Sequence, residues 1–550
     1  MSNTHDPTPT SSSDTITAAE RRDAIVVGAG HNGLVAAFYL ARAGIRPLVL
    51  ERRDVIGGAA VTEEFHPGFR NSSASYVVSL LREEIVADMD LKRHGYETIR
   101  LKGAFDPLHD GRSLLLTGDE DNDRAQIGQV SNRDYDAMGR FDEAMARLSD
   151  FLRDLMLREP PALGGGGIGD ILSMLRTGNR MRQLSAEDRH LLIQIFTAPA
   201  ADILDRWFDS DAVKARYAGS ITAGNAVSLR APGSSINMLH LSVGSVDGVR
   251  HRWAFAKGGM GSITQAMAKA LAEKGGAIRT GAAVKRIVIE DGRATGVELE
   301  NGERIDAKLV LANTDPNRTF LKLVGCDHLS ASFAQGIERF RQWSGSFRLN
   351  FALDGVPEFA CKPGPDIGVQ HQCFIHMGSG FADFEESFQA ASQGRLPKNP
   401  IVGANIPTSL DDSLAPPGKH IMGVLAQQYP KELADGRSWD SARDEATEGV
   451  IRVIERYIPK FRKQILGVMA LTPADLEARF GLTGGDVYHG RLDLDQLFSL
   501  RPHPEAAQYR TPIKGLYLCG SGAHPGGGVS GAPGYNAARR VLKDYRARRA

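Results

Sequence analysis

The sequence predicts an α/β fold in which a parallel sheet, assembled from separated stretches of the 550-residue chain, is interleaved with a second, α+β domain. Three observations predict it. A strand, a glycine-rich turn and a helix follow one another from Ala24, strands and a helix return over residues 255–313, and an apolar strand at residues 516–519 precedes a second glycine-rich loop. The chain is also too long for one hydrophobic core.

The first unit begins with the β-branched run 24–27, which is typical of a buried parallel strand. Gly28, Gly30 and Gly33 follow as G-x-G-x-x-G and lead into a helix. In this context Gly28 permits a tight turn, Gly30 lets the backbone approach a pyrophosphate, and Gly33 lets helix and strand pack closely. The free N–H groups of the helix would bind the phosphates.

A second strand, residues 47–50, ends at Glu51, which lies at the distance expected of an acid that binds an adenosine ribose. This strand–turn–helix–strand context predicts a Rossmann-type dinucleotide-binding domain rather than a glycine-rich turn without a ligand.

The stretch ERRDVIGGAAVTEEF follows and adds Arg53 and the pair Gly57-Gly58. Here the chain resembles the flavin-dependent amine oxidase and phytoene desaturase superfamily. The resemblance implies FAD as the cofactor, with Glu51 on the ribose, Arg53 on the adenosine side and the glycine pair beside the pyrophosphate. Many members have arginine after that pair, so the chain, which has Ala59, is not expected to make that contact.

Residues 255–313 contain a helix ending at Glu273, strands at 284–290, 295–300 and 309–312, and two hairpin turns. By the same resemblance, the backbone at Val284 reads the adenine. The alternative is an ordinary β-meander.

The strand at 516–519 is expected to return to the N-terminal sheet, and the loop after it to pass the flavin ring. Gly526, Gly528 and Gly531 repeat G-x-G-x-x-G, but no further strand and acid can follow before residue 550, so this is not a second dinucleotide domain. The helix that starts near Pro533 could direct its dipole at the flavin. The resemblance implies this set of FAD-binding residues: Gly28, Gly30, Asn32, Gly33, Glu51, Arg52, Arg53, Gly57, Gly58, Ala59, Val284, Gly520, Ser521 and Gly531.

LYLCGSGAHPGGGVSGAPGYNAA closely resembles the phytoene dehydrogenase-like branch, and within it the pyridine nucleotide-disulphide oxidoreductase domain protein 2 group. LRAPGSSINMLH at 229–240 and GLTGGDVYHGRLDLDQLFSLRP at 481–502 fit the same group. The "disulphide" in that name is not supported, because the four cysteines are scattered without a C-x-x-C pair.

These motifs divide the chain into interleaved domains. Residues 23–100, 250–320 and 505–545 are expected to form the FAD-binding domain, and residues 101–249 and 321–504 the substrate-binding domain. Residues 1–22 are polar and predict a disordered leader.

The substrate-binding part is expected to contain an amphipathic helix over 138–155, a helix over 185–208 and sheet strands at 346–353 and 420–427. The segment 169–184 mixes apolar and arginine residues. It could line a substrate mouth, contact a membrane surface, or be a solvated connector.

The family's chemistry implies hydride transfer between a C–H bond of a lipophilic, isoprenoid-like substrate and flavin N5. His524, Tyr535 and His240 are the predicted catalytic residues, followed by Asp486 and His489. Two alternatives stay open: a flavin amine oxidase, and a non-catalytic binding protein similar to the Rab GDP-dissociation inhibitors.

Equal numbers of basic and acidic residues, 66 each, give no reason to expect a nucleic-acid partner. No cysteine or histidine pattern predicts a metal site. The absence of a signal sequence and of a long apolar run favours a cytoplasmic protein, with contact at a membrane surface and homo-oligomer formation left open. A single nucleotide fold favours oxygen or a quinone as electron acceptor.

Overall fold

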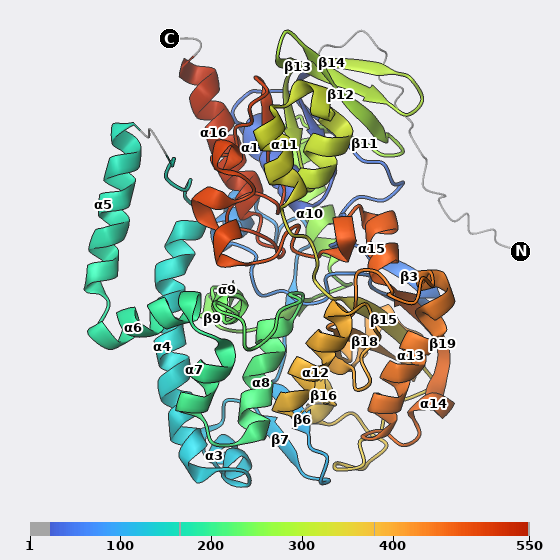
Figure 1. The fold of residues 1–550 in the computed structure, drawn as a ribbon. Coiled ribbons are helices and arrows are strands. Elements are labelled where there is room, and N and C mark those ends of the chain that lie inside the picture. The colour runs from blue at the N-terminus through green and yellow to red at the C-terminus, as the bar shows by residue number, and fades with distance from the viewer. Residues whose placement is uncertain (1–21, 164–166, 379, 548–550) are drawn as a thin grey trace, which may run out of the picture.

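A computed structural model of the chain describes residues 22–163, 167–378 and 380–547. The predicted leader lies outside these residues, apart from Arg22, which begins the first strand. The described residues form two seven-stranded sheets, one in the upper and one in the lower part of Figure 1, with helices packed around both.

The first sheet has the strand order β11-β2-β1-β14-β13-β12, with β20 also paired to β14. Its strands are β1 (Arg22–Val27), β2 (Pro47–Leu50), β11 (Ala277–Arg279), β12 (Val284–Glu290), β13 (Arg293–Leu299), β14 (Arg304–Ala312) and β20 (Leu516–Leu518). The predicted return of the C-terminal strand to the N-terminal sheet is confirmed, because β20 runs parallel to β14. Strand β11 was not predicted.

The parallel strands of this sheet end level with one another. Val27 is paired in register with both Leu50 and Ala312, and Ala312 with Leu518. Loops that follow these strands therefore meet at one edge, the place where open parallel sheets bind ligands.

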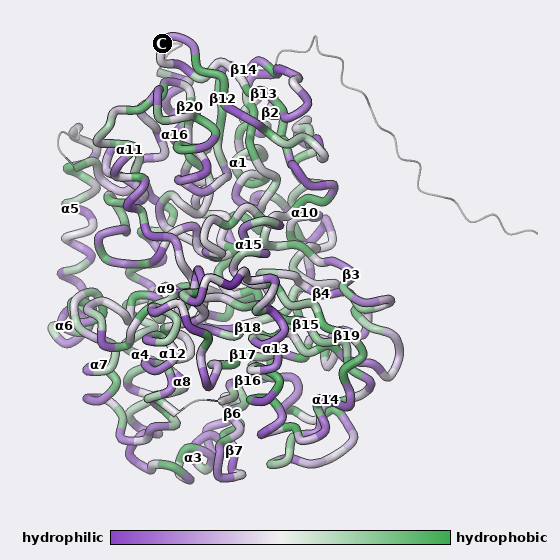
Figure 2. The backbone as a smooth tube through the Cα atoms, turned by 45° about the vertical axis from the view of Figure 1, so that its right-hand side comes forward, coloured by the Kyte–Doolittle hydropathy of each residue, from purple (hydrophilic) through white to green (hydrophobic). Residues whose placement is uncertain are grey.

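Helices α1 (His31–Arg42), α10 (Gly261–Glu273) and α16 (Ala532–Ala547) pack together against this sheet. Helix α1 buries ten of its twelve residues, consistent with its hydrophobic sequence (Figure 2). It also lies very close to α16, since a Cβ added at Gly534 would be 2.1 Å from the Asn32 carbonyl oxygen. The C-terminal helix is thus fixed beside the first glycine loop.

The second sheet has the order β19-β15-β18-β17-β16-β6-β7. Its strands are β6 (Ala104–Pro107), β7 (Ser113–Leu116), β15 (Phe347–Leu353), β16 (Phe374–Met377), β17 (Ile401–Asn405), β18 (His420–Gln427) and β19 (Ile465–Leu471). Strands β15 and β18 confirm the strands predicted at 346–353 and 420–427, and both are buried along their whole length, including Arg348 and Asn350 of β15.

The described residues also form short two-stranded sheets: β3 (Thr62–His66) with β4 (Phe69–Ser72), β5 (Thr98–Arg100) with β10 (Ala254–Ala256), and β8 (Ser245–Val246) with β9 (Val249–Arg250). The remaining helices are α2 (Glu83–Asp88), α3 (Glu120–Gly128), α4 (Asn132–Met156), α5 (Ile168–Gln183), α6 (Ala186–Thr197), α7 (Ala200–Trp207), α8 (Asp211–Thr222), α9 (Ile236–Ser242), α11 (Ala331–Glu338), α12 (Phe381–Ser392), α13 (Trp439–Glu455), α14 (Phe461–Gln464) and α15 (Pro473–Phe480).

The prediction of one helix over residues 185–208 is wrong. Ser185 does cap a helix, and its hydroxyl accepts a hydrogen bond from the Asp188 N–H. However, the helix ends at Thr197 and α7 begins after Pro199, because proline has no N–H and forces the preceding Ala198 into an extended conformation.

Helix α5 stands at the edge of the molecule (Figure 1). Its side chains Ile171, Leu172 and Leu175 are each more than half exposed. None of the described helices is both long enough and apolar enough to cross a membrane.

Candidate active site

A cavity of about 380 Å³ extends from the carboxyl edge of the first sheet to the second sheet. Val27 and Leu50, the last residues of β1 and β2, line one end, and Leu425 of β18 lines the other. The cavity therefore lies where the parallel strands predict a ligand site, and it continues into the part of the chain that carries the second sheet.

The first glycine loop has the geometry predicted for each glycine. Gly28 has a φ of +100°, which only glycine adopts readily. A Cβ added at Gly33 would lie 2.3 Å from the Gly28 carbonyl oxygen, so glycine is needed where α1 packs on the loop. Gly30 lines the cavity as the N-cap of α1, and its missing side chain leaves the backbone open to a ligand.

Glu51 is held rigidly beside this loop. Its carboxylate accepts hydrogen bonds from the backbone N–H groups of Ala29, at 2.9 Å, and of Arg53, at 3.0 Å. Its backbone carbonyl accepts another from Ala282, two residues before Val284 opens β12. Glu51 and Val284 both line the cavity, as required of groups that would bind a ribose and an adenine.

The two arginines after Glu51 connect the site to α15. Arg52 donates to the carbonyl groups of Ala478 and Arg479. Arg53 pairs with Glu63 and lies over the ring of Phe480. The side chains of Arg52, Arg53 and Phe480 thus line the cavity beside Glu51.

The glycine clusters from the two ends of the chain lie side by side. The Asn32 side-chain amide donates to the Ser521 hydroxyl at 3.0 Å, although 489 residues separate them. Gly528 and Val529 of the C-terminal loop line the same cavity. The sequence predicted this meeting of the two ends, and the structure shows it.

Most of the predicted cofactor-binding residues line the cavity: Gly28, Gly30, Asn32, Glu51, Arg52, Arg53, Gly58, Ala59, Val284 and Ser521. Gly33, Gly57, Gly520 and Gly531 do not. At each of these four positions an added Cβ would come within 3.0 Å of another part of the protein, so these glycines serve close packing.

The structure does not bring the three predicted catalytic residues into the cavity. The His524 ring bonds the Leu155 carbonyl at 3.0 Å, and the His240 ring bonds the Gly527 carbonyl at 2.9 Å. Tyr535 packs edge-on against a tyrosine of α1. None of the three lines the cavity, so their position does not support a catalytic role. A sequence position near a loop does not fix the direction of a side chain.

Further residues complete the lining, and among them the sequence analysis named His489 as a candidate catalytic residue. Rings from distant segments surround the end near the second sheet, together with aliphatic side chains: Tyr76, Trp253, Tyr488, Val77, Leu80, Leu241, Leu425, Leu482 and Val487. Leu482, Val487 and Tyr488 belong to the stretch 481–502 that resembles the family, but no motif marks the other six, which only the fold brings together.

Several polar atoms of lining residues are buried without a protein partner. They are His31 Nε2, Asn32 Oδ1, Arg53 Nη1, Arg318 Nε and His489 Nδ1. An unpaired buried polar atom costs about 1–3 kcal/mol, so a cluster of them indicates a polar ligand. Together with the open backbone at Gly30, these atoms fit a dinucleotide.

Two of these atoms belong to histidines that are neutral at pH 7. Burial lowers the pKa of His31 to about 4. Burial, with the nearby Arg501 and Arg318, also lowers the pKa of His489. His489 has a φ of +54°, a strained conformation that non-glycine residues seldom adopt. A neutral imidazole is able to accept a proton at its free nitrogen.

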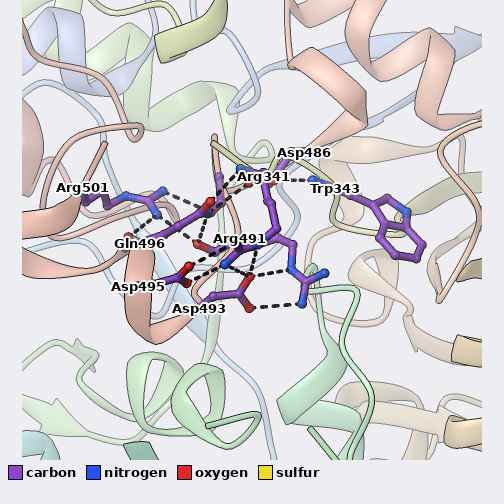
Figure 3. A network of polar contacts seen from close by, with 9 residues as sticks. Arg341, Trp343, Asp486, Arg491, Asp493, Asp495, Gln496 and Arg501 are labelled. Carbon is purple, nitrogen blue, oxygen red and sulfur yellow. Dashed lines mark hydrogen bonds and ion pairs between the residues drawn. The ribbon is translucent and has the colours of Figure 1, made fainter. Parts of the chain in front are cut away.

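The fully buried Arg501, which donates to the carbonyl groups of Arg491 and Gln496 in the network of Figure 3, holds the segment around His489 in place. One of its nitrogens, Nη2, donates to the carbonyl groups of Tyr488, Gly490 and Ser521 at 2.9–3.1 Å. Arg501 therefore joins this segment to the C-terminal glycine loop. Asp486 anchors the other side, because its carboxylate accepts N–H groups from Trp343 and Tyr488.

The buried histidines predict acid sensitivity. Burial lowers the pKa values of His31, His240 and His524 to about 4, below the unfolded value of 6.5. The folded state then binds fewer protons, so stability is complete above pH 6.5 and falls toward pH 4 by about 1.4 kcal/mol per histidine per pH unit. Burial raises the pKa of Asp486 to about 6, which offsets one of the three.

Urea unfolding at pH 7.5, 6 and 5 measures this dependence. We expect the midpoint to fall steadily below pH 6.5, and His524→Gln to make the fall less steep. A midpoint that is the same at pH 7.5 and 5 would contradict the prediction.

Comparison with known proteins agrees with the dinucleotide-binding geometry of the cavity. Residues 26–84 match the NAD(P)-binding Rossmann-like domain, and residues 112–542 match flavin containing amine oxidoreductase. The chain belongs to the flavin-containing amine oxidoreductase family. Membership makes it an oxidoreductase with a flavin cofactor, and it confirms the resemblance seen in the sequence.

The chain is 40% identical to the pyridine nucleotide-disulfide oxidoreductase domain-containing protein 2 of Rattus norvegicus over 95% of this chain and 94% of that protein. It is 29% identical to a limonene dehydrogenase subunit from Castellaniella defragrans, with the same coverage.

Among solved structures, it resembles putrescine oxidase bound to putrescine (TM-score 0.61, 15% identity, 96% and 99% coverage) and cyclohexylamine oxidase of Brevibacterium oxydans (0.55, 14%, 96% and 100%). At these identities the structural matches show the fold alone.

Proposed function

We propose that this flavin-containing amine oxidoreductase family member uses FAD to move a hydride between a lipophilic, isoprenoid-like substrate and the flavin. The observation that supports the proposal is that the two ends of one cavity differ in polarity. Its nucleotide end contains Glu51, Glu300 and three arginines, whereas its other end is lined by rings and aliphatic side chains without a carboxylate. An apolar substrate fits such a surface better than an ammonium ion does.

In this proposal residues 23–100, 250–320 and 505–545 form the FAD-binding domain, and residues 101–249 and 321–504 the substrate-binding domain. Glu51 binds the ribose, and the N-terminus of α1 binds the pyrophosphate. FAD, when bound, supplies an acceptor for hydride at its N5 atom. The rings of Tyr76 and Tyr488 position the substrate, and the neutral His489 holds or accepts a proton at Nδ1.

A flavin amine oxidase is the second candidate. The sequence showed no aromatic cage near the C-terminal loop, but Tyr76, Trp253 and Tyr488 line the cavity from other segments. Such rings could surround an uncharged amine.

Anaerobic bleaching of the bound flavin distinguishes the two candidates. We expect lipophilic alkenes or alcohols to bleach it and amines of similar size not to. Bleaching by amines alone would favour the second candidate, and a purified protein without visible flavin absorbance after addition of FAD would contradict both.

Replacement of His489 tests its role. His489→Gln is expected to slow flavin reduction at least ten-fold, because a positioned proton acceptor typically contributes more than that. The control His328→Gln changes an exposed histidine and should leave the rate unchanged. Stopped-flow reduction with equal flavin content measures both, and equal rates in the two variants would remove His489 from the reaction.

We also propose that α5 contacts an anionic membrane surface. Ile171, Leu172 and Leu175 are exposed on it, and Arg176 and Arg182 are exposed on the same helix. Apolar and basic side chains together suit the headgroup region of such membranes. None of the described α5 residues lines the cavity, so a substrate mouth is not supported.

Sedimentation with vesicles containing phosphatidylserine measures the contact. We expect Leu175→Asp to reduce binding at least five-fold, while Val249→Asp, at another exposed apolar position, should not. Equal binding of the two variants would contradict a membrane role for α5.

A further inference from the structure

A second cavity, of about 470 Å³, lies between α8 and the second sheet. Three of its lining residues form a polar cluster. The Asp106 carboxylate accepts a hydrogen bond from Arg216 at 2.8 Å, and its other oxygen lies 2.6 Å from His376 Nδ1. A carboxylate at Nδ1 favours a proton on that nitrogen, which leaves Nε2 of His376 as a hydrogen-bond acceptor.

Phe374 contacts side chains that line each of the two cavities. The Phe374 ring contacts the rings of Tyr76 and Trp253, with centroids 6.2 and 5.1 Å away, and both of these line the first cavity. The same ring also contacts His376, with centroids 4.9 Å apart, and His376 lines the second cavity. Phe374 therefore lies between the two.

The elements on either side of Phe374 run from one cavity to the other. On β18, Leu425 lines the first cavity and Gln427 the second. On α8, Gly219 lines the second cavity, and Ala223, just beyond the last turn, lines the first. The two cavities are thus consecutive along the same helix and strand.

We infer that the two cavities are successive compartments of one substrate channel, divided by Phe374, and that the second compartment binds a hydroxyl group at the far end of the lipophilic substrate. This inference rests on the proposed function. A hydroxyl group can donate to His376 Nε2 and accept from Arg216 at the same time.

The charges of the second cavity favour a neutral hydroxyl over an ion. Asp106, Asp110 and Asp211 line it and would repel a carboxylate. The partly exposed Arg216 would repel an ammonium ion. Because Arg216 and Arg112 pair with Asp106 and Asp110, little net charge is left to attract either.

Equilibrium dialysis of the holoenzyme with farnesol and with farnesene tests the inference, because these probes share a carbon chain and differ in the hydroxyl group. We expect the wild type to bind farnesol more tightly. His376→Phe should weaken the binding of farnesol about ten-fold and leave the binding of farnesene unchanged. The control His190→Phe, at an exposed position, should change the binding of neither probe. Equal effects of His376→Phe on both probes, or no effect on farnesol, would overturn the inference.

Flavin bleaching by farnesene distinguishes a failure of this inference from a failure of the proposed function. If farnesene bleaches the flavin but His376→Phe leaves farnesol binding unchanged, only the assignment of a hydroxyl site to the second cavity is wrong. If neither probe binds or bleaches the wild type, both proposals fail.

Crystals soaked with 11-bromo-1-undecanol give a test that needs no variant. Anomalous scattering should place the bromine in the first cavity and the hydroxyl group beside His376. A ligand confined to the first cavity, or one with the bromine beside His376, would overturn the inference.

Discussion

Replacement of Gly30 by valine is expected to abolish flavin binding while the protein stays folded. Gly30 lines the cavity at the start of α1, and an added Cβ would already lie 3.0 Å from the Asn313 side-chain nitrogen. The two methyl groups of valine would extend further, over the N–H groups that would bind the pyrophosphate. We expect flavin affinity to fall at least 100-fold, measured as visible absorbance per mole of purified protein.

The control for this variant is Gly139→Val on α4. No atom lies within 4 Å of a Cβ added at Gly139, and the residue is exposed, so the substitution adds the same bulk away from the cavity. Circular dichroism should be unchanged in both variants. Stoichiometric flavin in Gly30→Val would show that this loop does not bind the cofactor.

The end of the cavity at the first glycine loop could be predicted from the sequence because its parts are local. The run 24–27, the three glycines and Glu51 all lie within residues 24–51, and each glycine has a separate geometric reason to be there. The position of strand β20 could also be predicted, since a short apolar strand before a glycine loop had a parallel sheet to join.

The end of the cavity near the second sheet could not be predicted in this way. Tyr76, Trp253 and Leu425 are far apart in the chain, belong to no motif, and converge only when both sheets have formed. The direction in which a side chain points could not be predicted either. His524 lies within the predicted loop, yet its ring points to a carbonyl of α4, whereas His489 in another segment lines the cavity.

Replacement of Arg501 by leucine is expected to cause the largest loss of stability. Burial lowers the pKa of Arg501 to about 10, so the guanidinium is still protonated at pH 7. It donates to the carbonyl groups of Tyr488, Gly490, Arg491, Gln496 and Ser521. Leucine would leave these acceptors buried and unpaired, at a cost of about 3–5 kcal/mol in the free energy of unfolding.

Arg341→Leu is the matched control, because Arg341 belongs to the same network but its side chain is 45% exposed and pairs with Asp493 and Asp495 (Figure 3). An exposed ion pair contributes about 1 kcal/mol or less. Urea unfolding should therefore separate the two variants clearly. Since Arg501 joins Tyr488 to Ser521, Arg501→Leu should also weaken flavin binding, and Arg341→Leu should not. Equal shifts in both variants would mean that the buried arginine does not hold the cavity together.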